Sequence, residues 1–164
     1  MYAVQTAPVG LNYHPCRYGQ SRVTFRGPRQ QVRGRYVACL GGTETYGQFV
    51  ADPFPALLND QVGMPCVNLG VLNAGLDVWM KEPEILTIAA SAACSVMQVP
   101  GVQNVSNRMY SVHPRRNDRF LRPSLDLARL YPEVDFTDYH FTRHLLLDLH
   151  AFGPDRFDQV VAEL

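Results

Sequence analysis

Residues 36–47, with the sequence YVACLGGTETYG, constrain the fold of this chain more than any other stretch. A short apolar run with β-branched and aromatic residues is typical of a buried strand. Gly41 and Gly42 follow the run and allow a sharp backbone turn, so we expect Thr43 at the carboxyl end of the strand. Ligands bind at that edge in open parallel sheets, although the same residues also suit a tight turn without chemistry.

Two later segments repeat the pattern of apolar strand, turn and polar loop. Residues 65–69 lead into Gly70, and residues 94–99 lead into a Pro-Gly pair. The intervening segments predict one helix that starts at Asp52 and ends at Gly63, and a second from about residue 82 to 89. Alternating strands and helices at this spacing predict right-handed βαβ units. We therefore predict an α/β fold, a three-layer sandwich with a flavodoxin-like parallel sheet of strand order 2-1-3.

The rest of the chain has weaker patterns. Residues 1–35 are expected to form an N-terminal arm on the core, and residues 36–164 a single α/β domain. The other segments predict a short edge strand at 23–25, loops at 43–51 and 102–122, and helices at 121–130, 141–149 and 154–164. Because the last helix reaches the final residue without a stop signal, we expect the domain to be truncated and incomplete as a catalyst.

Composition excludes several classes of function. No run approaches the roughly 20 apolar residues of a membrane span, and the N-terminus lacks the charged start and apolar core of a signal peptide. The four cysteines form no CxxC pair, which disfavours zinc binding and thioredoxin-like chemistry. We therefore predict a cytoplasmic protein with no membrane partner, metal or cofactor.

Charges are segregated although the formal net charge is zero. Residues 1–43 contain six arginines and no acidic residue, and residues 101–122 contain five arginines and one aspartate. Arginine's planar fork suits carboxylate and phosphate groups, but these arginines could equally pair with acidic residues of the same chain. A net charge of zero produces no strong electrostatic attraction for the phosphate backbone of a nucleic acid, so a nucleic-acid partner is not expected.

The three strand-end loops resemble the conserved blocks of the SGNH/GDSL hydrolases, which are esterases on a flavodoxin-like sheet. Gly41-Gly42-Thr43 stands where that family has Gly-Asp-Ser, Asn68-Leu69-Gly70 stands in its second block, and Gly101-Val102-Gln103-Asn104 in its third. The resemblance implies an acyl-ester hydrolase or acyltransferase. Thr43 would be its nucleophile, and Gly70 and Asn104 its oxyanion donors.

A closer likeness covers residues 11–164. The phrases GGTETYG, QNVSNR and HPRRNDRF resemble an uncharacterised bacterial family known as a domain of unknown function. That resemblance implies no activity.

The chain departs from the hydrolase pattern at the catalytic groups. Threonine is a more hindered hydroxyl than serine and needs an adjacent base. The Asp-x-x-His motif that the family has near its end is missing, and Asp138 with His140 is the nearest imitation. His140 and His144 could instead share one helix face, and a metal on that pair would lack a third ligand.

Strand spacing predicts where these groups meet. Neighbouring strands lie about 4.8 Å apart, so we expect Thr43, Gly70 and Asn104 to converge on one pocket. In the alternative arrangement, Asn104 and Thr43 cap their own loops.

An arginine cluster at residues 113–119 suggests a second kind of site. It could hold a phosphate, sulfate or carboxylate, or it could be tied down by Asp126 or Asp135. The alternative function is therefore a non-catalytic binding module for an anionic or sugar ligand, and the oligomeric state is left open. The ligand-binding residues predicted from all these loops are Gly41, Gly42, Glu44, Thr45, Asn73, Gln103, Asn107, His113, Arg115, Arg116 and Arg119.

Overall fold

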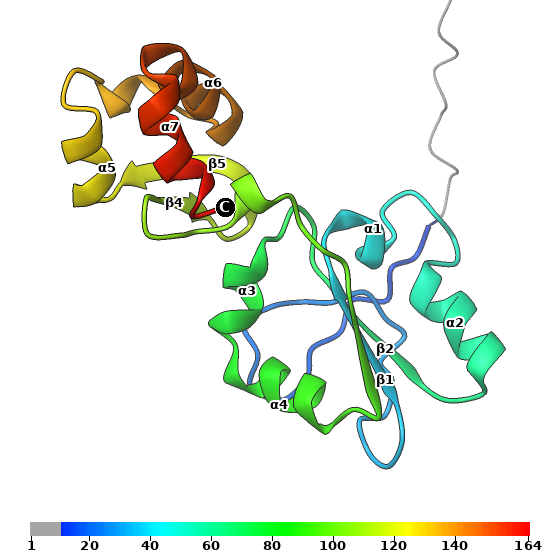
Figure 1. The fold of residues 1–164 in the computed structure, drawn as a ribbon. Coiled ribbons are helices and arrows are strands. Elements are labelled where there is room, and N and C mark those ends of the chain that lie inside the picture. The colour runs from blue at the N-terminus through cyan, green and yellow to red at the C-terminus, as the bar shows by residue number, and fades with distance from the viewer. Residues whose placement is uncertain (1–10) are drawn as a thin grey trace, which may run out of the picture. The chain divides into compact units, whose positions relative to one another are not determined.

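A computed structural model describes residues 11–164, which form two compact units. The described part of the first unit comprises residues 11–72 and 82–98, and the second comprises residues 73–81 and 99–164. Figure 1 shows the chain, which leaves the first unit at residue 73, returns to it at residue 82 and leaves it again at residue 99. The predicted division into an arm and one domain at residue 35 stays a prediction.

The first unit contains a parallel sheet of three strands. These are β1 (Val37–Gly41), β2 (Cys66–Gly70) and β3 (Cys94–Met97), in the order β2-β1-β3. In the register, Cys39 lies beside Asn68 of β2 and Val96 of β3. The predicted α/β class and the strand order 2-1-3 are confirmed.

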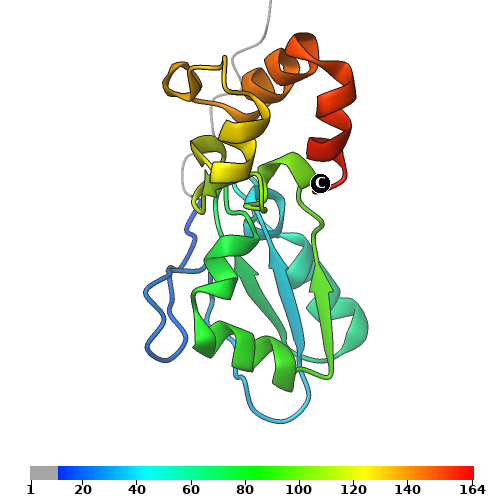
Figure 2. The same cartoon turned by 60° about the vertical axis from the view of Figure 1, so that its left-hand side comes forward.

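Helices lie on both faces of this sheet (Figure 2). Leu58 of α2 (Phe54–Val62) packs against Val37, Cys39 and Cys66. On the opposite face lies α4 (Pro83–Ser91), whose residue Ala89 accepts a hydrogen bond from the Ser95 hydroxyl at 2.8 Å.

The ends of α2 differ partly from the prediction. Gly63 closes the helix in the left-handed conformation, with φ of 62°, as expected. Asp52, however, does not cap its start, because the N-cap residue is Pro53.

Two predicted features of the first unit are wrong. Residues 43–51 include a one-turn helix, α1 (Thr43–Tyr46), which ends where Gly47 takes φ of 77°. Residues 23–25 form no strand, because only Phe25 pairs, in a single antiparallel bridge with Cys16. Propensity alone cannot reveal a helix of one turn that depends on its tertiary contacts.

The second unit packs helices against a two-stranded antiparallel sheet. Its core is a cluster of eight buried residues: Tyr110, Val112, Phe120, Leu127, Tyr131, Leu145, Leu149 and Val160. The elements are α3 (Leu76–Met80), a 3-10 turn η1 (Val102–Asn104), β4 (Tyr110–His113), β5 (Arg116–Pro123), α5 (Leu125–Leu130), a 3-10 turn η2 (Phe136–Asp138), α6 (Thr142–Phe152) and α7 (Pro154–Val161).

The predicted polar loop at 102–122 is therefore wrong. It contains η1, β4 and most of β5, while the three C-terminal helices are confirmed with shifted ends. In β4, Tyr110 and Val112 are buried and alternate with half-buried Ser111 and His113. This alternation is the period of a strand with one buried face, but the polar composition around it concealed it.

None of the helices in residues 11–164 has the length and hydropathy that a membrane span requires.

Because the central strand β1 is buried, we predict that the free energy of unfolding decreases at alkaline pH. Desolvation, followed by repulsion from Cys66 and Cys94, raises the pKa of the Cys39 thiol from 9.0 to about 12. The folded state therefore keeps a proton that the unfolded state loses, so stability falls as the pH rises from 9 to about 12. Chemical denaturation across this pH range should show that the free energy of unfolding falls less steeply in Cys39→Ala than in the wild type. Val37→Ala, which removes volume beside Cys39 but no titratable group, should keep the wild-type slope; equal slopes in all three proteins would contradict the prediction.

Candidate functional site

The turn after β1 is held by a side chain from the end of β3. The Gln98 carboxamide oxygen accepts hydrogen bonds from the Gly42 N–H and the Thr45 hydroxyl, each at 2.9 Å. Its nitrogen donates to Glu44 at 2.7 Å. Gln98 therefore ties the residues that follow β1 to β3.

A second carboxamide holds the same turn from β2. The Asn68 side chain is buried, donates to the Thr45 carbonyl at 2.9 Å and accepts from the Gly70 N–H at 2.9 Å. We call Asn68 and Gln98 the carboxamide pair.

Glycine is required where this turn meets the strands. A Cβ on Gly70 would overlap the backbone nitrogen of Tyr46, and a Cβ on Gly41 would overlap the Thr45 hydroxyl. The strand ends therefore approach α1 as closely as backbone allows. Among the predicted site residues, Gly41, Gly42, Thr43, Glu44, Thr45 and Gly70 thus come from one compact region of the first unit.

The other predicted site residues belong to the second unit. Asn104 accepts a hydrogen bond from the Thr142 hydroxyl at 2.9 Å. Asn107 accepts from the Met109 and Tyr110 N–H groups, so it caps its own turn. The carbonyl oxygen of Gln103 accepts from the Tyr110 hydroxyl at 2.9 Å, and that of Asn73 accepts from the Asn117 N–H at 3.1 Å. The convergence of Thr43, Gly70 and Asn104 stays a prediction.

A cluster of basic side chains forms around β5. The Phe120 N–H donates to the His140 carbonyl at 3.0 Å, and Arg119 forms an antiparallel bridge with Phe141. This pairing brings residues 140–141 beside β5. Arg116, Asp118, Arg119, His140 and Phe141 line a hollow of about 240 Å³.

The arginines of this hairpin have no acidic partner among the described residues. Ion pairs in residues 11–164 involve Arg22, Arg108, Arg129 and Arg156, and not Arg115, Arg116 or Arg119. The two carboxylates that could have tied them down are engaged elsewhere. Asp126 pairs with Arg129 at 3.8 Å, and Asp135 accepts from the Thr137 N–H at 2.9 Å.

The histidines near this hollow have separate local contacts. His113 accepts a hydrogen bond from the Arg115 N–H at 3.1 Å, so it stabilises the hairpin turn. The His144 ring lies edge-on to Phe141, with ring centres 5.9 Å apart. Asp138 and His140 are both exposed, and no hydrogen bond between them is found in the described residues.

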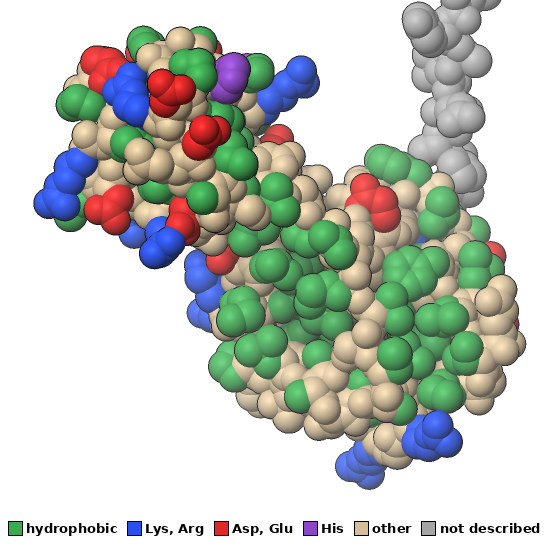
Figure 3. Space-filling model, in the orientation of Figure 1, with side chains coloured by type: hydrophobic (Ala, Val, Ile, Leu, Met, Phe, Trp, Pro, Cys, Tyr) green, Lys and Arg blue, Asp and Glu red, His purple; other side chains and the backbone are tan. Residues whose placement is uncertain are grey.

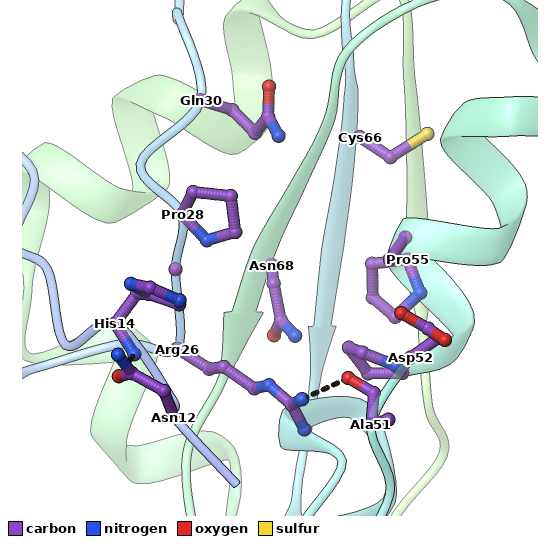
Figure 4. A pocket seen from close by; sticks show the side chains of 13 residues that line it. Asn12, His14, Arg26, Pro28, Gln30, Ala51, Asp52, Pro55, Cys66 and Asn68 are labelled. Carbon is purple, nitrogen blue, oxygen red and sulfur yellow. Dashed lines mark hydrogen bonds between the residues drawn. The ribbon is translucent and has the colours of Figure 1, made fainter. Parts of the chain in front are cut away.

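A second hollow, of about 260 Å³, lies beside β2 (Figure 4). Arg26 crosses it and donates to the carbonyls of Ala51 and Gly47, while its guanidinium lies 5.0 Å from the Tyr13 ring centre. Arg26 is 4% exposed, and these contacts explain its burial as a structural tie between the N-terminal segment and the loop after α1. None of the predicted site residues lines this hollow.

No metal centre is formed in the described part of the chain. Residues 11–164 contain no group of three or more His, Cys, Asp or Glu side chains that could hold an ion.

The carboxamide pair was missed by the sequence prediction. The one signal for Asn68 is a polar residue inside the apolar run CVNLG, and the signal for Gln98 is its position directly after an apolar run. Neither signal identifies the partners, because these lie far away in the sequence.

The fold defines a mixed α/β protein, and the chain belongs to the family described as a domain of unknown function (DUF6473), whose profile matches residues 1–164. No curated protein and no solved structure matches the chain. Membership in a family of unknown function is thus confirmed, whereas a bacterial origin and a relationship to the SGNH hydrolases stay predictions.

Removing Gln98 should change the titration of Glu44. The hydrogen bond from Gln98, together with one from its own backbone, lowers the pKa of the Glu44 carboxyl below 4.5. The stabilisation is present above the unfolded pKa and is lost as the pH falls through the lowered folded pKa. In Gln98→Ala, carbon-detected NMR should show the Glu44 pKa rising towards 4.5, while Gln48→Ala leaves it unchanged. An unshifted Glu44 in Gln98→Ala would show that this contact does not form in solution.

Proposed function

We propose that this chain is a binding domain for a small anionic ligand, held in the hollow beside β5. The observation that carries the proposal is the gathering of Arg116, Arg119 and His140 around one hollow without an acidic partner within ion-pair distance. Arginine forks bind carboxylate, phosphate and sulfate through charge-assisted, often bidentate hydrogen bonds.

The remaining lining residues narrow the ligand class. Asp118 supplies a hydrogen-bond acceptor in the same hollow and disfavours a ligand that is negative throughout. Phe141 is 46% exposed, and its ring offers an apolar wall. An organic anion with hydroxyl groups, such as a sugar phosphate or sugar acid, fits this combination of an anion site, an acceptor and a ring.

Titration calorimetry with inorganic phosphate and with glucose 6-phosphate tests the proposal. We expect both to bind, and the sugar phosphate to bind more tightly. Arg116→Ala and Arg119→Ala should each weaken binding about tenfold, because each removes about 1.4 kcal/mol of charge-assisted hydrogen bonding at an exposed site.

Arg122→Ala is the matched control for this experiment. Arg122 is an exposed arginine of the same strand that does not line the hollow, so its removal deletes the same charge and should leave binding within about twofold. Equal losses of affinity in all three variants would mean that binding depends only on the net charge of the protein, which contradicts a defined site. Absence of binding by wild type would also contradict it.

A second candidate is the acyl-ester hydrolase or acyltransferase. It is favoured by the strand order, because Gly41-Gly42-Thr43 follows the central strand of a 2-1-3 parallel sheet, where open α/β sheets bind ligands. Against it stands the Gly70 N–H, which already donates to Asn68 and would have to leave that partner to serve an oxyanion.

A fluorophosphonate probe separates the two candidates. The binding proposal predicts that the protein binds glucose 6-phosphate while mass spectrometry finds no phosphonylated Thr43. Labelling at Thr43 that disappears in Thr43→Val but persists in Thr87→Val would instead establish a nucleophile and favour the hydrolase. Thr87 is an exposed helical threonine outside the turn and serves as the control.

A further inference from the structure

The edge strand β3 is unusually exposed. All four of its residues are exposed, including Val96 at 37% and Met97 at 49%, whereas every residue of the other edge strand, β2, is buried. Figure 2 shows β3 at one border of the sheet with β1 on its inner side. Figure 3 shows hydrophobic side chains gathered on one face of the first unit.

The backbone of β3 offers hydrogen-bonding groups on its outer side. The Gln98 N–H donates inwards to the Leu40 carbonyl at 2.9 Å. Backbone groups of successive residues in a strand point to opposite sides, so Ser95 and Met97 direct their N–H and C=O groups away from β1. A strand edge of this kind is a template for pairing with another strand.

The sequence around β3 lacks the features that usually prevent such pairing. Monomeric proteins protect an edge with charged side chains, prolines or bulges. Residues 85–107 contain no charged side chain, and the proline nearest to β3 is Pro100, beyond its end. The edge is thus uncharged and mostly apolar, as in many buried contacts.

We infer that β3 pairs antiparallel with β3 of a second copy of this chain, joining two three-stranded sheets across a twofold axis. In such a contact the residue on the axis faces its own copy, and the other edge residues lie within a few residues of theirs, so the same charge on both copies would repel across the axis. The absence of charge from residues 85–107 therefore favours a second copy, and a partner with a charged strand would gain no complementary group here.

The pattern of outward groups sets the register. With the axis at Val96, Ser95 of one copy lies opposite Met97 of the other, and the two residues exchange both backbone hydrogen bonds. Val96 then faces Val96 of the other copy in the closely spaced type of pair, with about 4.5 Å between Cα atoms. This contact involves no residue of the anion site and does not depend on the proposed function.

Sedimentation equilibrium at about 50 μM protein, far above a micromolar Kd, tests the dimer. We expect wild type at twice the monomer mass. Val96→Lys places two like charges opposite each other and should raise the dimer Kd at least about tenfold. Leu121→Lys alters an equally apolar exposed residue of β5, 50% exposed, and should stay dimeric. A monomeric wild type, or a Val96→Lys protein as dimeric as wild type, would overturn the inference.

A cysteine at the axis tests the register in the same protein. Val96→Cys should form an intermolecular disulfide under mild oxidation, because about 4.5 Å between Cα atoms lies within disulfide range. The native Cys94 is exposed but would lie about 13 Å from its copy, four residues along the strand, so wild type should not crosslink. Crosslinking of wild type at Cys94, or none in Val96→Cys, would overturn the register.

Discussion

Two carboxamides hold the turn that follows the central strand, and the arrangement of the first unit depends on them. Asn68 and Gln98 approach the turn from β2 and β3 and bind four of its groups: the Gly42 N–H, the Thr45 hydroxyl, the Thr45 carbonyl and Glu44. Because Gly41 and Gly70 have no side chain, α1 can lie directly against the strand ends. The edge of the sheet where open α/β proteins bind ligands is therefore largely occupied by internal contacts.

In the second unit, by contrast, polar side chains around one hollow are left without internal partners in the described residues. Its core consists of aromatic and aliphatic side chains, and several of its charged residues form ion pairs, for example Arg156 with Glu133. The arginines of β5 do not pair within the described residues, although Asp126 and Asp135 belong to the same unit. Exposed cations gathered around a hollow are the feature that an anion would satisfy, so we locate the proposed function there and not at Thr43.

The parallel sheet was predictable because each of its strands is a continuous apolar run with a clear end. The hairpin was not, because only Tyr110, Val112 and Phe120 are buried in a segment that is otherwise mostly polar and rich in arginine. The helix α1 was also missed, since one turn depends on contacts to Asn68 and Gln98 that local sequence does not encode. Residue types indicated the arginine cluster, but whether Asp126 and Asp135 neutralise it depends on distances that only coordinates supply.

Native-state hydrogen exchange of the Gly42 and Gly70 amides shows whether the carboxamides of Gln98 and Asn68 occupy the edge of the sheet in solution. Both amides lie at strand ends, where open turns exchange rapidly unless a partner accepts the N–H. We expect protection comparable to that of Leu40 within β1, and in Gln98→Ala we expect the Gly42 amide alone to lose this protection. Exchange of both amides as fast as that of the exposed Gly34 would contradict it and would leave the strand ends open for a substrate.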